Sequence, residues 1–141
     1  MSIDRSIDPT ADQVRALRDG PAEGPIVMVN MLKFKDRADY PDDYSGDDPA
    51  VSGKEAYARY QQAFTVTVAE TSQAEVIYHG PVQQVFIGRD GGAAEDWDKM
   101  LIVRYPSKQH FLAMMANEAY REALVHRYAG LERTVLLQCK G

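Results

Sequence analysis

The sequence contains very little cysteine: Cys139 is the single thiol among 141 residues. A lone cysteine excludes an intramolecular disulfide framework and a zinc site of the CxxC type. No apolar run approaches the roughly 18 residues that a membrane-spanning helix requires. Residues Met1 to Asp8 lack the apolar centre of a secretory signal. We therefore expect a protein of a reducing compartment, by default the cytoplasm, with no membrane partner.

An excess of positive charge is also missing, since 16 lysines and arginines face 21 acidic residues and the formal net charge is −5. Such a chain has no basic surface for nucleic acid. Nucleotide-binding, zinc-protease and serine-hydrolase motifs are absent from the sequence. The aspartates of one loop lack the spacing of a calcium-binding loop and are interpreted as a solvated acidic stretch; they are Asp42, Asp43, Asp47 and Asp48. We expect no metal and no nucleic-acid partner.

The composition that remains is that of an ordinary globular domain, with 45% hydrophobic and 26% charged residues. A length of 141 residues suits one such domain. We divide the chain into an N-terminal helix and linker, residues 1–24, and a single domain, residues 25–141. The long irregular stretch 36–52 is interpreted as a functional lid or a mobile loop.

Apolar periodicity, glycine and proline predict the regular elements. Helices are expected over residues 10–19, 53–71 and, in two segments, 107–130. Strands are expected over residues 26–34, 74–87 with an interruption at Gly80-Pro81, 97–105 and 131–139, with a turn over 89–95. Ser107 and Asn117 are the predicted caps of the last two helical segments.

After the first helix the order is β-α-β-β-α-β, which is typical of a ferredoxin-like α+β fold. In that fold two helices cover one face of an antiparallel four-stranded sheet. The opposite face would expose Val27, Val29 and Met31 in a monomer. We therefore predict a homodimer that pairs these sheet faces.

Four stretches of the sequence carry a resemblance to a known family: VNMLKFK, GKEAYARY, WDKMLIVRYPSKQHFLAMM and AYREALVHR. Together they resemble the DUF1330 family of the dimeric α+β barrel superfamily, over about Ile26 to Cys139. The resemblance implies a ferredoxin-like dimer but no defined reaction. Other members of the superfamily include cofactor-free monooxygenases, muconolactone-type isomerases and haem-degrading enzymes. Leu124 stands where the haem-degrading relatives place their iron-ligating histidine, so we expect no haem, and no other cofactor.

Three polar residues are candidates for catalysis. Asn30 interrupts an apolar strand face, where it either orients a ligand or is a buried amide satisfied by a neighbour. His110, in the first turn of a helix, and His79, before Gly80, are candidate general bases because imidazole titrates near pH 6.5. The alternative for His110 is a surface or half-buried histidine near a helix start, whereas His79 reaches either the pocket or the dimer seam. His126, late in a helix, is interpreted as structural.

Six residues are candidates for substrate binding: Arg104, Tyr105, Tyr57, Tyr60, Met114 and Tyr120. Arg104 and Tyr105 are adjacent in a strand and must point to opposite faces. Arg104 either holds a carboxylate in the pocket, or it pairs across the dimer seam or with an acidic loop residue, and the sequence leaves these options open. The tyrosines either orient a ligand or simply fill the core.

These residues favour a small-molecule pocket between the sheet and the helices, closed by residues 36–52. The leading hypothesis is cofactor-independent chemistry, of an oxygenase or isomerase type, on a small organic acid or aromatic compound. The alternatives are a non-catalytic module that binds a metabolite and a structural dimer with a filled core. The sequence leaves open whether the protein is an enzyme.

Overall fold

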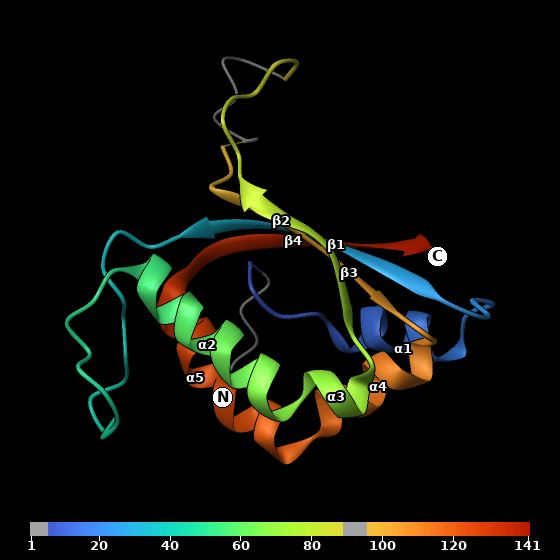
Figure 1. Ribbon diagram of the computed structural model, residues 1–141, viewed down its shortest axis with the longest axis horizontal. Coiled ribbons are helices and arrows are strands. Elements are labelled where there is room, and N and C mark those ends of the chain that lie inside the picture. The colour runs from blue at the N-terminus through green and yellow to red at the C-terminus, as the bar shows by residue number, and fades with distance from the viewer. Residues whose placement is uncertain (1–5, 89–95) are drawn as a thin grey trace.

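The computed structural model describes residues 6–88 and 96–141, which form a sheet covered on one face by helices (Figure 1). All pairings between neighbouring strands are antiparallel, and the strand order is β2-β3-β1-β4. The strands are β1 (Ile26–Phe34), β2 (Glu75–Pro81), β3 (Lys99–Tyr105) and β4 (Leu131–Lys140). The helices are α1 (Ala11–Asp19), α2 (Gly53–Thr67), α3 (Ala69–Ser72), α4 (Lys108–Ala116) and α5 (Glu118–Gly130). The predicted ferredoxin-like α+β fold is confirmed.

The core lies between the sheet and the helix layer. Ile26, Met28 and Leu32 alternate along β1 and are buried, while Val103 and Tyr105 do the same on β3. Because successive side chains of a strand point to opposite faces of the sheet, every second side chain lies against the helices. Burying such a side chain stabilises the fold by about 1.5–3 kcal/mol.

Side-chain caps explain where four of the helices begin, including α1, where the Thr10 hydroxyl accepts from the amide of Gln13. The Ser52 hydroxyl accepts a hydrogen bond from the backbone amide of Glu55 at the start of α2. Ser107 accepts from the amide of His110, and Asn117 accepts from the amide of Ala119. Each cap satisfies a helix-end amide that has no partner within the helix. The predicted caps of α4 and α5 are confirmed.

The second strand is shorter than the sequence pattern predicts. It ends at Pro81, whereas the expectation was a strand to residue 87. Proline has no amide hydrogen to continue the ladder, and β2 is an edge strand. The register shift lies between Val76 and Tyr78 rather than at Gly80-Pro81. Residues 82–88 project away from the helix layer (Figure 1), and the predicted turn over 89–95 lies outside the described residues.

The helix predicted over residues 53–71 is divided into α2 and α3 at Val68. The Val68 amide donates to the carbonyl of Phe64, while the Val68 side chain is fully buried. The break is a local change of backbone conformation at Val68, where φ is −121° and ψ is −33°, and helical periodicity in the sequence does not show it.

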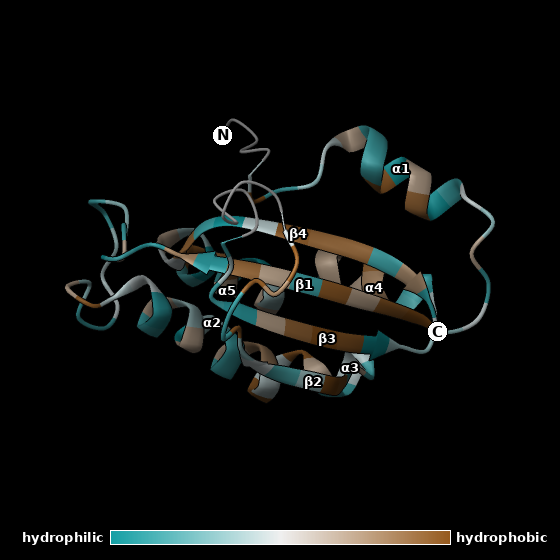
Figure 2. Ribbon diagram, turned by 90° about the horizontal axis from the view of Figure 1, so that it is seen from above, coloured by the Kyte–Doolittle hydropathy of each residue, from teal (hydrophilic) through white to brown (hydrophobic). Residues whose placement is uncertain are grey.

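The outer face of the sheet carries apolar side chains and no helix of the described residues covers it (Figure 2). Val27, Val29 and Met31 of β1 are half-buried there, and Val135 and Leu137 of β4 are 38% and 51% exposed. Helix α1 lies to one side of the sheet, near the β4 edge (Figure 2). The face is therefore apolar but uncovered within one chain.

The N-terminal residues are joined to the domain by specific contacts. Ile7 is buried against the core, and the Lys108 Nζ donates to the carbonyl of Gly20 at 2.6 Å. The Tyr128 hydroxyl donates to the Asp8 carboxylate at 2.7 Å. These bonds secure both ends of the segment that carries α1.

Candidate functional site

A pocket of about 120 Å³ lies between the inner face of the sheet and the helices. Its walls come from β1, β2, β3, β4, α2, α4 and α5. The polar side chains that line it are Asn30, Tyr57, Tyr60, Gln61, Thr65, Tyr105, Tyr120 and Arg127. The lining also includes the exposed Val76 and Leu136, so the pocket opens to solvent.

Asn30 occupies the middle of β1, between the buried Met28 and Leu32. Its amide nitrogen Nδ2 donates to the carbonyls of Met28 and Leu101, at 3.3 and 3.1 Å. Both amide hydrogens are therefore used by the sheet itself. Within the described residues its oxygen Oδ1 accepts no hydrogen bond, so Oδ1 is the atom that a ligand donor could reach.

Four tyrosines dominate the pocket wall. The rings of Tyr57 and Tyr60 have centroids 5.3 Å apart, and Tyr120 meets Tyr60 edge-on at 6.2 Å. The Tyr105 hydroxyl donates to the sulfur of Met114 at 3.5 Å. Tyr57 is only 3% exposed, yet its hydroxyl has no hydrogen-bond partner among residues 6–88 and 96–141. A buried hydroxyl without a partner is uncommon in proteins.

Burial controls the protonation of these phenols. It raises the pKa of Tyr57 to about 12, and it raises the pKa of Tyr60 well above its ordinary value. A phenol is protonated at neutral pH even with its ordinary pKa, and burial extends this protonated range further into alkaline pH, so both groups are available as hydrogen-bond donors. The positive charge of Arg127 acts in the opposite direction on both, which shows that the guanidinium lies close to the two phenols.

Arg127 and Gln61 are pocket residues that the sequence interpretation missed. Arg127 is fixed by Nη2, which donates to the carbonyl of Ile7 at 2.8 Å, and by an ion pair with Asp8 at 3.9 Å. Its spacing of seven residues from Tyr120 was the available signal, because two helical turns return a side chain to the same face. Gln61 lies four residues after Tyr57 and is found by the same rule.

The pocket brings together six of the predicted site residues: Asn30, Tyr57, Tyr60, Tyr105, Met114 and Tyr120. His110 lies outside its lining, and its imidazole Nδ1 lies 2.7 Å from the Ser107 hydroxyl. Arg104 lies on the outer face, is exposed, and pairs with Glu75 at 3.8 Å. The partner of Arg104 within the described residues is therefore a strand residue of the same chain, rather than the acidic loop residue that the sequence suggested.

His79 lines a second, more open hollow of about 640 Å³. This hollow lies where β1, β2 and β3 meet the start of α2. Lys54 and Lys99 line it together with His79. The Lys99 Nζ donates to Gln61 Oε1 at 3.3 Å, and this contact lies between the two hollows because Gln61 lines only the inner one.

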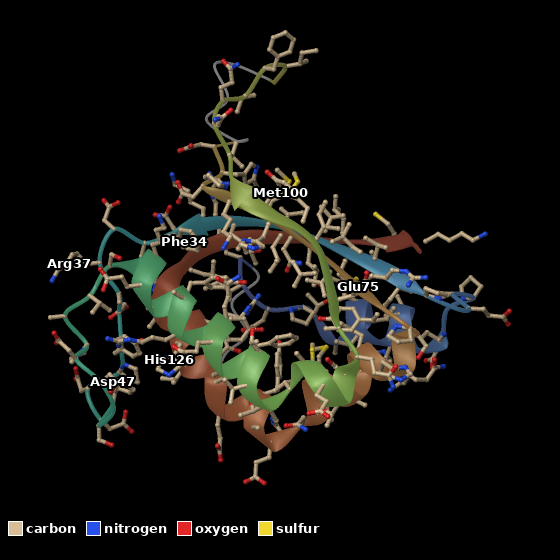
Figure 3. The ribbon with its side chains drawn as sticks, viewed as in Figure 1. Phe34, Arg37, Asp47, Glu75, Met100 and His126 are labelled. Carbon is tan, nitrogen blue, oxygen red and sulfur yellow. The ribbon has the colours of Figure 1, made fainter. Side chains whose placement is uncertain are left out.

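The loop over residues 36–52 packs beside the helices instead of over the inner pocket. Its Tyr40 hydroxyl lies 2.8 Å from His126 Nδ1 and accepts a hydrogen bond from Arg59 at 3.2 Å. Figure 3 shows His126 and Asp47 at the same end of the molecule, where the loop meets the helices. None of its residues lines the inner pocket, while Asp36 and Ser52 line the outer hollow.

No group of three or more His, Cys, Asp or Glu side chains is arranged to hold a metal ion within residues 6–88 and 96–141. In the same ranges, every helix is too short or too polar to cross a bilayer.

Comparison with known proteins identifies the family. The model of "Domain of unknown function (DUF1330)" matches residues 47–138. The chain is similar to a protein of unknown function from Rhodopseudomonas palustris, with 35% identity and a TM-score of 0.83 over 96% of this chain and 95% of that one. No curated protein matches the chain.

The fold is shared more widely. A dimeric protein of unknown function with a ferredoxin-like fold from Bacteroides fragilis has a TM-score of 0.51 and 10% identity, covering 83% of this chain and 96% of that one. At this identity the likeness shows the fold alone. Because the family model matches residues 47–138 and the Rhodopseudomonas palustris protein is 35% identical over 96% of this chain, the chain belongs to the DUF1330 family.

Proposed function

We propose that the protein binds a small organic acid or aromatic compound in the inner pocket. The hydroxyl of Tyr57 is the observation that carries this proposal, because it is a buried donor without a partner among the described residues. Leaving such a group unpaired costs about 1–3 kcal/mol. A ligand oxygen at this position would recover that free energy.

The volume of the pocket limits the ligand to a small molecule. A dry cavity of about 150 Å³ holds one benzene molecule, and the inner pocket measures about 120 Å³. A short-chain acid fits this space, and so does an aromatic ring that extends through the open side of the pocket, whereas a nucleotide does not. The aromatic walls, including Phe64 and Phe111, suit the apolar part of such a ligand.

The polar groups favour a negatively charged or strongly accepting end on the ligand. Arg127 and the protonated phenols are donors, whereas no carboxylate of the described residues lines the pocket. A carboxylate, enolate or phenolate oxygen would therefore be stabilised. Asn30 Oδ1 would accept from a hydroxyl at the other end of the ligand.

Binding is the part of the hypothesis that the geometry supports most directly. Donors aimed at a developing oxyanion also serve the cofactor-independent isomerase or oxygenase chemistry predicted from the sequence. The two predicted bases, His79 and His110, lie outside the inner pocket. The non-catalytic alternative, a module that only sequesters its ligand, needs no base at all.

A ligand titration tests the proposal. Benzoate and benzamide would be titrated into the whole protein by calorimetry, with Tyr57→Phe and Tyr78→Phe as variants. Tyr78 is half-exposed on the outer face and is a matched control. We expect benzoate to bind more tightly than benzamide, and Tyr57→Phe to weaken benzoate binding about tenfold or more.

The Tyr57→Phe variant should fold, because it removes a hydroxyl that has no partner in the described structure. Saturable binding of neither probe would contradict the proposal. Equal weakening by Tyr57→Phe and Tyr78→Phe would also contradict it, since the effect would then not arise in the pocket.

We also propose that two copies pair through the outer face of the sheet. The apolar side chains of β1 and β4 on that face support this arrangement, because a monomer leaves them in contact with water. Pairing identical faces about a two-fold axis covers both at once.

A further inference from the structure

The outer hollow of about 640 Å³ has a charge pattern that the proposed function does not use. It is lined by Ser52 and Lys54 at the start of α2, His79 near the end of β2, and Lys99 at the start of β3. These residues are distant in sequence and are assembled by the fold. Its volume is within the range of about 300–1,000 Å³ that is usual for ligand sites.

Two lysines face this hollow without an acidic partner. Within residues 6–88 and 96–141, no carboxylate oxygen lies within 4.0 Å of the ammonium group of Lys54 or Lys99. Partial burial and then the charge of Lys54 lower the pKa of Lys99, so the two like charges sense each other. Lys54 also lies in the first turn of α2, where the helix dipole disfavours a cation.

The acidic residues of the same hollow do not compensate these charges by direct contact. Asp98 accepts a hydrogen bond from the Phe34 amide at 2.9 Å and interacts with Lys33 at 3.4 Å. Asp36 is exposed and forms no ion pair within the described residues. An anion between the two lysines would offset the partial burial of the Lys99 ammonium group and its repulsion by the exposed Lys54.

We propose that the outer hollow binds a small oxyanion, a carboxylate or a phosphate group, between the ammonium groups of Lys54 and Lys99. His79 lies in the wall of the site and can donate a further hydrogen bond. The site is separate from the inner pocket, because no residue lines both hollows. It gives a role to two lysines and a histidine that the inner pocket leaves unused.

The test uses inorganic phosphate and acetate as probes on the whole protein, followed by amide chemical shifts at constant ionic strength. We expect saturable shifts at Ser52, Lys54, His79 and Lys99. Lys54→Gln and Lys99→Gln should each weaken binding about fivefold to tenfold. Lys140→Gln is the matched control, because Lys140 is an exposed lysine that pairs with Ile26 at the opposite end of β1.

The relative affinity of the probes identifies the ligand group. Tighter binding of phosphate assigns a phosphate group, and tighter binding of acetate assigns a carboxylate. Non-saturating shifts with both probes, or equal weakening by Lys140→Gln, would overturn the proposal. Lys54→Gln removes one positive charge but leaves the hydrogen bond between Lys99 and Gln61 in place. Weaker binding in this variant would therefore come from the lost charge and not from a lost hydrogen bond. Tyr57→Phe should leave these shifts unchanged, which separates this site from the inner pocket.

Discussion

At the scale of single residues, burial decides what the polar side chains of this protein can do. Tyr57 and Tyr60 are protonated donors at neutral pH, as any phenol is, and burial raises their pKa values so that they remain donors in more alkaline solution. Burial has the opposite effect on the pKa of His126, because the charged form of a histidine is the protonated one. Burial, and then the charge of Arg59, lower its pKa from the ordinary value of 6.5, against the opposing effect of Asp47. The folded protein therefore holds this imidazole neutral, so that its Nδ1 can accept from the Tyr40 hydroxyl.

This arrangement predicts a loss of stability in mild acid. Because the folded-state pKa of His126 lies below the unfolded value, its contribution is complete above about pH 6.5 and is lost as the pH falls through the folded-state pKa. Urea denaturation at pH 7.5 and pH 5.5 should show a smaller decrease in the free energy of unfolding for His126→Gln than for the wild-type protein. An identical decrease in both proteins would show that the imidazole does not contribute.

A companion prediction concerns the anchoring of the 36–52 loop. Tyr40→Phe removes the hydroxyl that lies between His126 and Arg59. We expect a decrease of about 1 kcal/mol in the free energy of unfolding and faster amide hydrogen exchange in the loop. Tyr44→Phe is the control, because Tyr44 contributes its ring to the stack rather than a hydroxyl hydrogen bond within the described residues. Equal exchange in the two variants would count against the anchor.

At the scale of elements, the close approach of α2 and α5 positions the pocket walls. Gly53 begins α2 and Gly130 ends α5, and each backbone lies against the other. A Cβ on Gly130 would meet the carbonyl oxygen of Gly53 and would lie 2.9 Å from the amide nitrogen of Tyr57. Because those atoms belong to the backbone, they cannot move aside as a flexible side chain does.

Gly130→Ala should therefore destabilise the protein by about 1–3 kcal/mol, which is the usual cost of overpacking. Gly24→Ala provides the comparison, since a Cβ there meets no atom within 4 Å and only its φ of 72° opposes the change. That backbone conformation costs a non-glycine residue about 1–2 kcal/mol. Thermal or urea unfolding would measure both variants, and a neutral Gly130→Ala would show that the two helices can separate.

At the scale of the whole molecule, one face of the sheet makes the core and the other remains apolar and uncovered (Figure 2). Phe86 and Ile87, on the segment that projects from the end of β2, are 86% and 89% exposed. Side chains of this kind are costly to leave in water. Their position on the side of the sheet away from the helices agrees with pairing through the outer face.

Sedimentation velocity measures this prediction. Leu137→Asp places a charge on the outer face and should weaken the dimer at least about tenfold. Val66→Asp makes the same kind of change at a 75% exposed position on α2, outside the sheet, and should leave the dimer intact. A wild-type protein that remains a monomer at micromolar concentration would falsify sheet-face pairing.

Much of the architecture was determined by local sequence. Alternating apolar residues predicted β1 with its observed bounds, and Ser107 and Asn117 predicted the starts of α4 and α5. The local pattern wrongly predicted that the second strand continues over residues 82–87. This segment leaves the sheet after Pro81 although it carries apolar residues. Periodicity identifies residues that could pair, but it does not show whether a neighbouring strand is present to pair with them.

Only the tertiary structure decided which polar residues share a pocket. The strand pattern placed Arg104 and Tyr105 on opposite faces without showing which face the helices cover. The fold directs Tyr105 inward, and it brings Arg127 of α5 and Tyr57 of α2 to the same cavity. It also assembles Lys54, His79 and Lys99 from three separate elements. Side-chain direction within an element is a local property, whereas proximity between elements depends on how the whole chain packs.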